Sequence, residues 1–424
     1  MEPLTDVLPG PRSGGPVQLA NGRVQHTDGY TIDAATLDMA ASATPPNTER
    51  ARASRMTQFV SWCQERGRLH DDPGTLADWA HWLAVQQHPA ETIDVYTATV
   101  AERLANSGVL VPPSERDLIA RIVQARSRDE AQDDDGHGDV LQAEECTRED
   151  LAAMLAVHHP ETVEGIRNRL VLSLAWYMGA RASEPASLRV RDMRVETVRL
   201  VDRETGELCE LPALVVTLRL SKTSPHGRTA ERIRILAQED DTCPVAAWRA
   251  WSAVLDRNGV TSGPLLRRVK NGQLTTAGRP PADPSRAGGI GDRTIRNVIA
   301  SSALAAGLTR PLLPEEREIM SAAAERAELS ALVLTEEGRA AVRTRRRLAR
   351  RALRRELRRY SGHSMRRGPV RHDQRAGVSR DVIERQYRYT PGSRALARYL
   401  DDLVAWSSNP TVPTRYRLAD ANRA

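Results

Sequence analysis

The chain has 424 residues, which favours two domains with extensions over a single domain. Its net charge of +6 and isoelectric point of about 9.4 are compatible with a polyanionic partner. The four cysteines are scattered and lack zinc spacing, which argues against a disulfide framework and a metal site. The sequence shows no leading signal and no long apolar run, which argues against a membrane partner. We therefore expect a soluble cytoplasmic protein.

The amino-terminal part of the chain divides into an arm, a helical domain and a linker. Residues 1–46 are rich in Gly, Pro, Ser and Thr and lack apolar periodicity, which predicts a flexible arm. Between residues 47 and 127 apolar residues recur four times at helical spacing, as at Met56, Phe59 and Cys63. This pattern predicts a small bundle of four helices. The charged, Gly-containing run of 128–146 predicts a linker.

A second domain is predicted over residues 147–405. It opens with a capping box at Thr147–Asp150, and a long helix stops at Gly179. Two alternating segments, Leu214–Leu220 and Glu231–Leu236, flank a turn-rich string and predict a β-hairpin. Further helices are expected at about 244–256, 293–306, 365–376, 379–386 and 393–405. Residues 406–424 form a tail, for which docking on a neighbouring protomer and a frayed end are equally favoured.

Residues 309–359 form an unusual insertion within this second domain. Its second part, Arg339–Arg359, holds eleven arginines and one glutamate. The segment is either a long helix exposed to solvent or an element that binds phosphates. A run of one charge repels itself without a polyanion, so we favour DNA contact. The candidate DNA-binding residues are Arg345, Arg346, Arg347, Arg350, Arg351, Arg354 and Arg355.

The second domain offers Arg, Lys, His and Tyr, but no Walker loop, acidic pair or metal cluster. Phosphoryl transfer without a metal needs another way to neutralise the transition state. Guanidinium groups can do this because they match phosphate oxygens in pairs and stay charged. A nucleophile and a proton donor for the leaving oxygen are also required. We expect no cofactor and no metal.

Two strings resemble the arginine boxes of tyrosine recombinases, the family of phage integrases. Tyr177–Leu188 resembles the first arginine box, which implies that Arg181 binds phosphate. Ser361–Gly368 resembles the His-x-x-Arg box and implies that His363 and Arg366 form the matching pair. The same resemblance implies that Glu184 orients Arg181 without taking part in the chemistry.

Further strings extend the resemblance to roughly residues 47–405. Ser221-Lys-Thr on the predicted hairpin is similar to the catalytic lysine turn of the family, which implies a role for Lys222. Arg398-Tyr-Leu matches the nucleophile box and implies Tyr399. Ala376–Gln386 matches the stretch before the His/Trp position of the family. A single box is a weak signal, whereas five boxes in the right order are a strong one.

The sequence departs from the family pattern in three ways. The His/Trp position is occupied by Tyr389, which can still donate a hydrogen bond to phosphate. The spacing from Tyr389 to Tyr399 is one residue longer than usual, and the 309–359 insertion lies before the His box. None of these departures removes a required group.

Each candidate also has an ordinary structural explanation. Arg181 could simply pair with Glu184, Lys222 could be a polar turn residue, and Tyr399 could face the core. The co-occurrence of the boxes in order favours the catalytic interpretation. The competing nucleophiles are Tyr360, Tyr387, Tyr389 and Tyr416.

The resemblance implies a mainly α fold with a small antiparallel β element, in which a helical core-binding domain and a catalytic domain form a C-shaped DNA clamp. It implies a site-specific DNA recombinase that works through a 3′-phosphotyrosyl bond. Two double-stranded recombination sites would be held by a homotetramer, strands would be exchanged through a Holliday junction, and accessory DNA-bending proteins could assist. A nucleoid location follows from such partners.

Two other functions stay open at this stage. A catalytically silent DNA-binding protein could use the same scaffold, and a type IB topoisomerase shares the tyrosine chemistry. A protein-interaction scaffold built on the Arg-rich helix would leave the ordered boxes unexplained. The DNA sequence of the site and the choice between integration, excision, transposition and dimer resolution do not follow from the residues.

Overall fold

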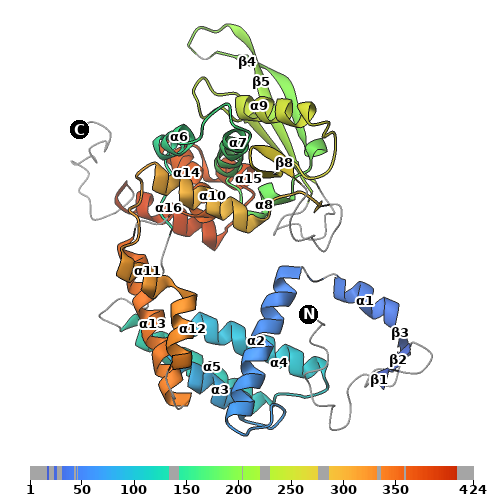
Figure 1. Ribbon diagram of the computed structural model, residues 1–424, viewed down its shortest axis with the longest axis vertical. Helices are drawn as coiled ribbons and strands as arrows, with labels where there is room; N and C mark the ends of the chain where they lie inside the picture. The colour runs from blue at the N-terminus through green and yellow to red at the C-terminus, as the bar shows by residue number, and fades with distance from the viewer. Residues whose placement is uncertain are drawn as a thin grey trace. The chain divides into compact units, whose positions relative to one another are not determined.

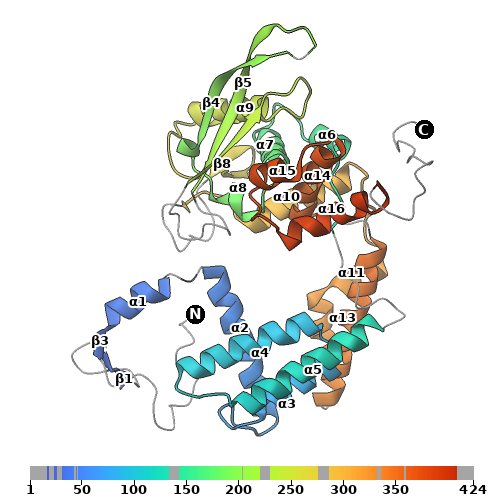
Figure 2. The same cartoon turned by 180° about the vertical axis from the view of Figure 1, so that it is seen from behind.

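The chain divides into two compact units, which are described separately. The first comprises Met1–Leu141 and Leu313–Leu353, and the second comprises Gln142–Leu312 and Arg354–Ala424 (Figures 1 and 2). The computed structural model describes residues 17–18, 23–25, 31–42, 44, 46–132, 143–202, 204–219, 230–275, 286–331, 336–357 and 360–407. It describes the backbone alone for residues 17, 18, 23, 25, 38, 41, 42, 46, 47, 331, 336, 337 and 401–407.

Short regular elements occupy the described part of the amino-terminal segment. Strands β1 (Val17–Gln18), β2 (Arg23–Gln25) and β3 (Thr31–Asp33) form an antiparallel sheet, and α1 (Ala34–Ser42) follows. The sequence analysis did not predict these short elements, and the flexibility of the arm at residues 1–46 stays a prediction. The sheet pairs β-branched Val24 with Ile32, a strand-favouring signal too short to register as periodicity.

Four helices follow in the first unit, as the apolar spacing predicts. They are α2 (Pro46–Glu65), α3 (Thr75–Val85), α4 (Ala90–Asn106) and α5 (Pro113–Ala131). Their shared core is rich in aromatic side chains: the Phe59 and Trp79 rings lie 5.1 Å apart at a tilt of 57°. A bundle this small therefore draws much of its stability from a few large rings.

The insertion belongs to the first unit, although its place in the chain put it in the second domain. It forms α11 (Pro314–Met320), α12 (Ala322–Ala331) and α13 (Glu336–Glu356), and α13 belongs to the first unit up to Leu353. Thr344 on α13 donates a 2.7 Å hydrogen bond to Gln86 Oε1 at the end of α3. Helix α13 also buries apolar residues, Ala340, Val342 and Leu353, which explains why it packs on protein instead of standing in solvent.

The second unit begins with helices that surround its core. These are α6 (Arg148–Ala156), α7 (Val163–Tyr177) and the short α8 (Ser183–Ser187), followed by a 3-10 turn at Val190–Asp192. The predicted capping box is present, because the Thr147 hydroxyl accepts from the Asp150 N–H while the Asp150 carboxylate accepts from the Thr147 N–H. Nearly all of α7 is buried, so it is the central helix of the unit.

A three-stranded antiparallel sheet lies beside these helices. Its strands are β4 (Met193–Val201), β5 (Leu208–Leu218) and β6 (Glu231–Leu236), in that order. The predicted hairpin corresponds to β5 and β6. The sequence analysis missed β4, whose side chains are mostly half-exposed or exposed and so give a weak apolar signal.

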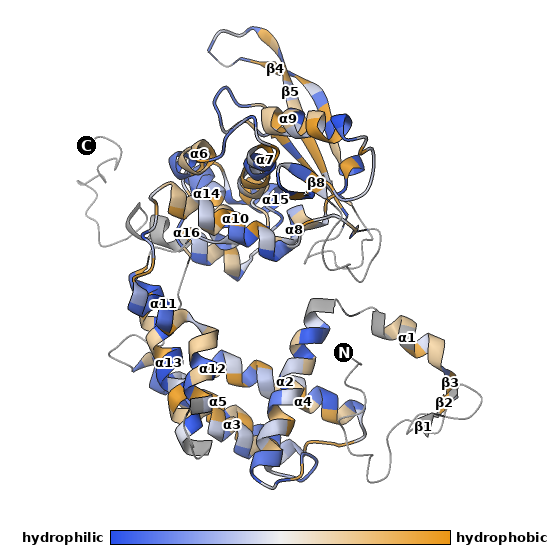
Figure 3. Ribbon diagram, viewed as in Figure 1, coloured by the Kyte–Doolittle hydropathy of each residue, from blue (hydrophilic) through white to orange (hydrophobic). Residues whose placement is uncertain are grey.

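The remaining elements complete the second unit around α7. They are α9 (Pro244–Arg257), β7 (Arg268–Lys270), β8 (Gln273–Thr275), α10 (Asp292–Ala305), α14 (Gly362–Arg375), α15 (Arg380–Gln386) and α16 (Arg394–Ser407). Helix α9 buries Trp248, Trp251 and Leu255 and shows both apolar and polar residues along its length (Figure 3). The observed class is mainly α with small antiparallel sheets, as predicted. Within the described residues, no helix combines the length and apolar character that a membrane crossing requires.

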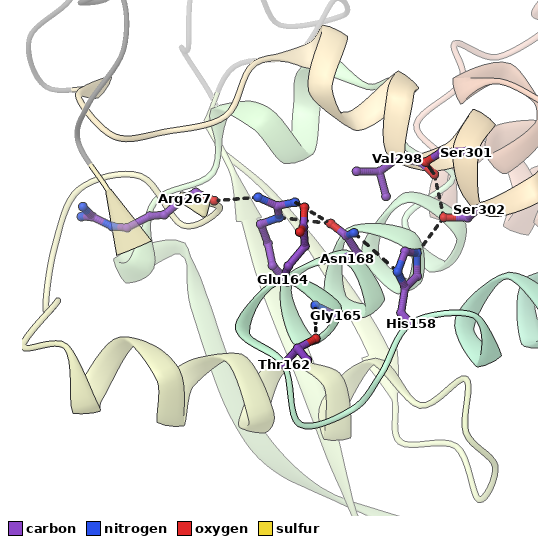
Figure 4. Close-up of polar contacts among 10 residues, drawn as sticks. His158, Thr162, Glu164, Gly165, Asn168, Arg267, Val298, Ser301 and Ser302 are labelled. Atoms are coloured by element: carbon purple, nitrogen blue, oxygen red, sulfur yellow. Dashed lines mark hydrogen bonds and ion pairs between the residues drawn. The ribbon is translucent and has the colours of Figure 1, made fainter. Parts of the chain in front are cut away.

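A buried polar network ties α7 to α10 (Figure 4). His158 Nε2 and Ser302 Oγ lie 2.7 Å apart, and Arg167 donates to Asn168 Oδ1 at 2.8 Å and to Glu164 Oε1 at 3.0 Å. Burial lowers the pKa of His158. Ser302 is only 1% exposed, so this His–Ser pair is a packing feature and not a reachable nucleophile.

Candidate active site

The first arginine box lies at a tight turn at the end of α7. Gly179 has a φ of +51°, and a Cβ there would sit 2.5 Å from Cδ1 of Tyr387. Only glycine accepts both the left-handed backbone and this close approach. The turn leads directly into Arg181, whose side chain is partly exposed.

Arg181 is held by a buried carboxylate. Its Nη1 and its backbone N–H donate to the two oxygens of Glu184, each at 3.1 Å. Glu184 is 2% exposed and also accepts from Arg388 Nη2 at 2.6 Å. Arg388 has a positive φ of +57° and donates from Nη1 to the Met178 carbonyl at 3.1 Å. Glu184 therefore contacts Arg181, a pairing that fits both the orienting role and the ordinary structural explanation, while Arg388 is a partner that the sequence analysis missed.

Arg366 is deeply buried on α14. It is 3% exposed, and its Nη1 and Nη2 donate to the carbonyls of Gly179 and Tyr387 at 2.5 and 3.0 Å. Burial lowers the pKa of Arg366, Tyr389 opposes that shift, and Arg181 adds to the lowering. The two predicted arginines thus lie close enough to influence each other electrostatically.

Tyr389 stacks on Arg366, and Tyr399 lies edge-on to Tyr389. Its guanidinium carbon lies 4.1 Å from the centre of the Tyr389 ring, a cation–π contact. The Tyr389 and Tyr399 rings are 6.3 Å apart and nearly perpendicular, at 87°. Burial raises the pKa of Tyr389 to about 12, although Arg366 counteracts this rise.

Tyr399 lies on α16, which is anchored by its apolar face. Leu396 and Leu400 are buried in a small cluster with Val370 and Ile383, and Tyr399 packs against this cluster while staying half-buried. Its backbone position is therefore fixed by packing, which fits both a nucleophile and a core-facing ring.

The structure says less about His363 and Lys222 than about the two arginines. His363 is exposed in the first turn of α14, where its backbone N–H donates to Ser361 Oγ at 3.2 Å. It precedes Arg366 by three residues, so both project from neighbouring positions on one helix face. Lys222 lies outside the described residues, within 220–229.

Two of the competing tyrosines are occupied elsewhere. The Tyr360 hydroxyl donates to Asp150 Oδ2 at 3.0 Å, and the Tyr387 hydroxyl donates to Asp373 Oδ2 at 2.8 Å. Both rings are buried, and burial raises the pKa of Tyr387. Tyr416 lies outside the described residues.

The arginines of α13 mostly contact their own unit. Arg346 Nε donates to Glu328 Oε2 at 2.5 Å, and Arg345 pairs with the same carboxylate. Arg350 pairs with Glu325 at 2.7 Å and donates to the carbonyl of Ile319 at 2.8 Å.

The remaining candidates on α13 differ in their surroundings. Arg347 Nη1 donates to His88 Nε2 at 2.9 Å. Arg354 is exposed, and Arg351 and Arg355 are half-buried and engaged in contacts. Helix α13 is therefore not fully exposed to solvent, and several of its arginines already have partners within the protein.

A cavity of about 470 Å³ borders the site in the second unit. It is lined by Arg388, Tyr389 and residues 231–233 of β6. Among the described residues no group of three His, Cys, Asp or Glu side chains could hold a metal ion.

No protein-family model matches the sequence, and no curated protein matches it. The chain is similar to two solved structures of tyrosine recombinases. One is a XerA recombinase, 13% identical over 86% of this chain and 90% of the other, with a TM-score of 0.31. The second is a lambda integrase dimer bound to a COC′ core site, 12% identical over 97% of each chain, with a TM-score of 0.35. These are distant likenesses, and they assign no role to any residue of this chain.

Proposed function

We propose that this chain is a site-specific DNA strand-transfer enzyme of the tyrosine recombinase type, with Tyr399 as its nucleophile. One observation carries the proposal: Arg366 stacks 4.1 Å from the Tyr389 ring, and the Tyr399 ring lies 6.3 Å from that of Tyr389. The pairing of Arg181 with the buried Glu184 supports it, because this contact orients a second guanidinium.

Guanidinium groups replace a metal in the proposed reaction. Arg181 and Arg366 bind the two non-bridging oxygens of the scissile phosphate and stabilise the charge that grows in the transition state. The hydroxyl of Tyr389 donates a further hydrogen bond. The phenol oxygen of Tyr399 attacks phosphorus, forming a 3′-phosphotyrosyl bond, while the bond from phosphorus to the 5′ oxygen breaks.

Two proton transfers complete this step. A free tyrosine has a pKa of about 10, so Tyr399 needs a base, for which His363 is our candidate. The departing 5′ oxygen takes a proton from Lys222. The phosphodiester energy is kept in the covalent bond, so the 5′-hydroxyl of a partner strand reverses the step without ATP.

Covalent trapping tests the nucleophile. A pool of nicked duplexes of randomised sequence is incubated with the protein, and DNA that stays attached after denaturation is counted and sequenced. The Tyr399→Phe variant should form no adduct. Tyr360→Phe is the matched control and should keep adduct formation, since its hydroxyl is bound to Asp150. Adducts formed by Tyr399→Phe at the rate of the unmodified protein would refute the assignment.

A sulfur substrate tests the general acid. A thiolate leaves without protonation far more readily than an alkoxide, because thiols are much stronger acids than alcohols. We expect Lys222→Ala to slow cleavage of ordinary DNA and to recover on DNA with sulfur at the bridging 5′ position. Equal losses on both substrates would remove Lys222 from this role.

Assembly follows from the same proposal. Two duplexes would be held by a homotetramer that exchanges strands through a Holliday junction, and accessory DNA-bending proteins would bring the sites together. Such an enzyme works at the nucleoid.

One observation favours a second candidate, a catalytically silent DNA-binding protein on this scaffold. Arg366 is 3% exposed, and both of its terminal nitrogens already donate to backbone carbonyls. Phosphate binding then requires the Tyr389 ring to move off the guanidinium. DNA binding by the unmodified protein without any covalent adduct, in the trapping assay above, would select this candidate.

A further inference from the structure

Arg388 has a backbone conformation that arginine rarely adopts. Helix α15 ends at Gln386, Tyr387 caps it, and Arg388 follows with a φ of +57°. A side chain in this left-handed region costs free energy, and glycine is the residue that usually takes this place after a helix. The backbone alone therefore gives no reason for an arginine here, so the reason lies in what its side chain contacts.

The guanidinium group of Arg388 is buried between partners from two distant parts of the chain. Arg388 is 8% exposed. Its Nη2 donates to Glu184 Oε2 at 2.6 Å, and its Nη1 donates to the Met178 carbonyl at 3.1 Å. Its Nε lies 3.4 Å from Oε2 of Glu231, the first residue of β6. A buried cation with two carboxylate partners and one carbonyl partner is held in one orientation.

These contacts fix the carboxylate that Arg181 binds. Glu184 Oε1 accepts from Arg181 Nη1 at 3.1 Å, and Oε2 accepts both from the Arg181 backbone N–H and from Arg388. The last torsion of a glutamate side chain is only weakly restricted by its own geometry. Without Arg388 the carboxylate can turn, and the Arg181 guanidinium loses a fixed partner. Arg388 therefore acts on Arg181 through Glu184.

The turn that contains Arg388 also carries Tyr389. The backbone N–H of Tyr389 donates to the Glu384 carbonyl at 2.8 Å, which closes the end of α15 directly after Arg388. Arg366 Nη2 donates to the Tyr387 carbonyl at 3.0 Å, and the Tyr389 ring lies 4.1 Å from the Arg366 guanidinium carbon. The turn at 387–389 is thus held by Arg366 through its backbone and by Arg388 through its side chain.

We infer that Arg388 is a positioning residue for the proposed strand transfer, the function on which this inference rests. Its side chain orients Arg181 through Glu184, and its turn orients Tyr389. Arg388 itself does not contact the phosphate, because each of its three nitrogens already has a partner and two of these partners are carboxylates. Loss of the side chain therefore slows the chemical step and leaves DNA binding nearly unchanged.

Removing the side chain while keeping the backbone tests this role. Arg388→Gly retains the left-handed turn, since glycine adopts a positive φ without strain. On saturating nicked duplex, the single-turnover rate of adduct formation should fall about 10- to 100-fold, as expected for a misplaced reacting group. The DNA affinity, measured by fluorescence anisotropy, should stay the same. Arg385→Ala is the matched control and should keep the rate, because the Arg385 side chain is 76% exposed and pairs with Asp381 of its own helix.

Free guanidinium separates a positioning role from a loss of stability. The cavity of about 470 Å³ is lined by Arg388, Glu231 and Tyr389, so the space that Arg388→Gly leaves is reachable from solvent. At about 10 mM, far below the molar concentrations that unfold proteins, guanidinium chloride should restore part of the rate of Arg388→Gly. Equal sodium chloride should not, and neither salt should speed Arg385→Ala. A folding defect would be worsened by guanidinium instead of relieved.

The outcomes separate this inference from the proposed function. Adduct formation by Arg388→Gly at the rate of the unmodified protein would overturn the inference and leave the proposed function intact. A slower rate that guanidinium does not raise would give Arg388 a structural role alone and also overturn it. If Arg388→Gly does not fold, Arg388→Lys takes its place, with a rate about tenfold lower because lysine makes one point contact instead of a fork. No adduct from the unmodified protein would refute the proposed function and this inference together.

Discussion

Both units gather arginines, but they neutralise them with different partners. In the first unit, Arg346 and Arg350 on α13 pair with glutamates of the neighbouring helix α12. In the second, Arg366 donates to backbone carbonyls, and Arg181 shares one buried carboxylate with Arg388. Backbone carbonyls carry no full charge, so the second cluster keeps more of its positive potential. The density of arginines along a sequence is therefore a poorer guide to phosphate binding than the partners they find.

The largest expected effect tests whether Arg366 contacts phosphate. Arg366→Lys removes the planar fork and should slow covalent adduct formation by about 100- to 1,000-fold, as for other transition-state donors. Single-turnover adduct rates measure this. Arg367→Lys is the neighbouring control, because Arg367 donates instead to the Ala143 carbonyl at 3.1 Å. Equal rates for both variants would place Arg366 outside the reaction.

The next effect concerns the shared carboxylate. Arg388→Met leaves Glu184 buried with one cationic partner, and we expect the free energy of unfolding to fall by about 3 kcal/mol. Urea unfolding measures it. Adding Glu184→Gln to this variant should recover part of the loss, since the unpaired charge is then gone. A loss below about 1 kcal/mol would show that Arg388 is dispensable.

A smaller effect separates the two arginine clusters. Arg346→Gln with Arg350→Gln should lower stability by about 2 kcal/mol in total, because each half-buried pair contributes roughly 1 kcal/mol. The slope of DNA affinity against salt should not change. A slope that falls by about one for each arginine would mean that α13 contacts phosphates after all.

The smallest effect depends on pH. The pKa of His88 is about 4 in the folded protein and 6.5 in the unfolded chain, so acid protonates the unfolded state first. Stability from this residue is complete above pH 6.5 and is lost as the pH falls towards 4, by about 1 kcal/mol after screening. The difference in unfolding free energy between the unmodified protein and His88→Gln should narrow from pH 7 to 5. A constant difference would contradict the shift.

The sequence predicted the local elements well but not all of their packing. The helices of residues 46–131 and the β5–β6 hairpin followed from periodicity and turn residues, and Thr147 from its capping pattern. The attachment of α13 to the first unit did not, because it depends on contacts such as Thr344 with Gln86, far apart in the chain.

The sequence likewise predicted only some of the contacts at the candidate site. Arg181 and Glu184 are three residues apart, so their contact could be anticipated from helical spacing. Arg388 reaches the same carboxylate from 204 residues away, with a backbone conformation rare for arginine. A sequence has no local signal for such a contact. The roles proposed for Arg181, Lys222, His363, Arg366, Tyr389 and Tyr399 all stay predictions.

The discontinuity of the first unit has a consequence for synthesis. Its two pieces are separated by Gln142–Leu312, so helix α13 leaves the ribosome long after α2–α5. At typical elongation rates of 5–20 residues per second this interval is roughly 10–35 s. During that time the end of α3, which contacts α13 through Gln86, stays exposed to solvent and to chaperones.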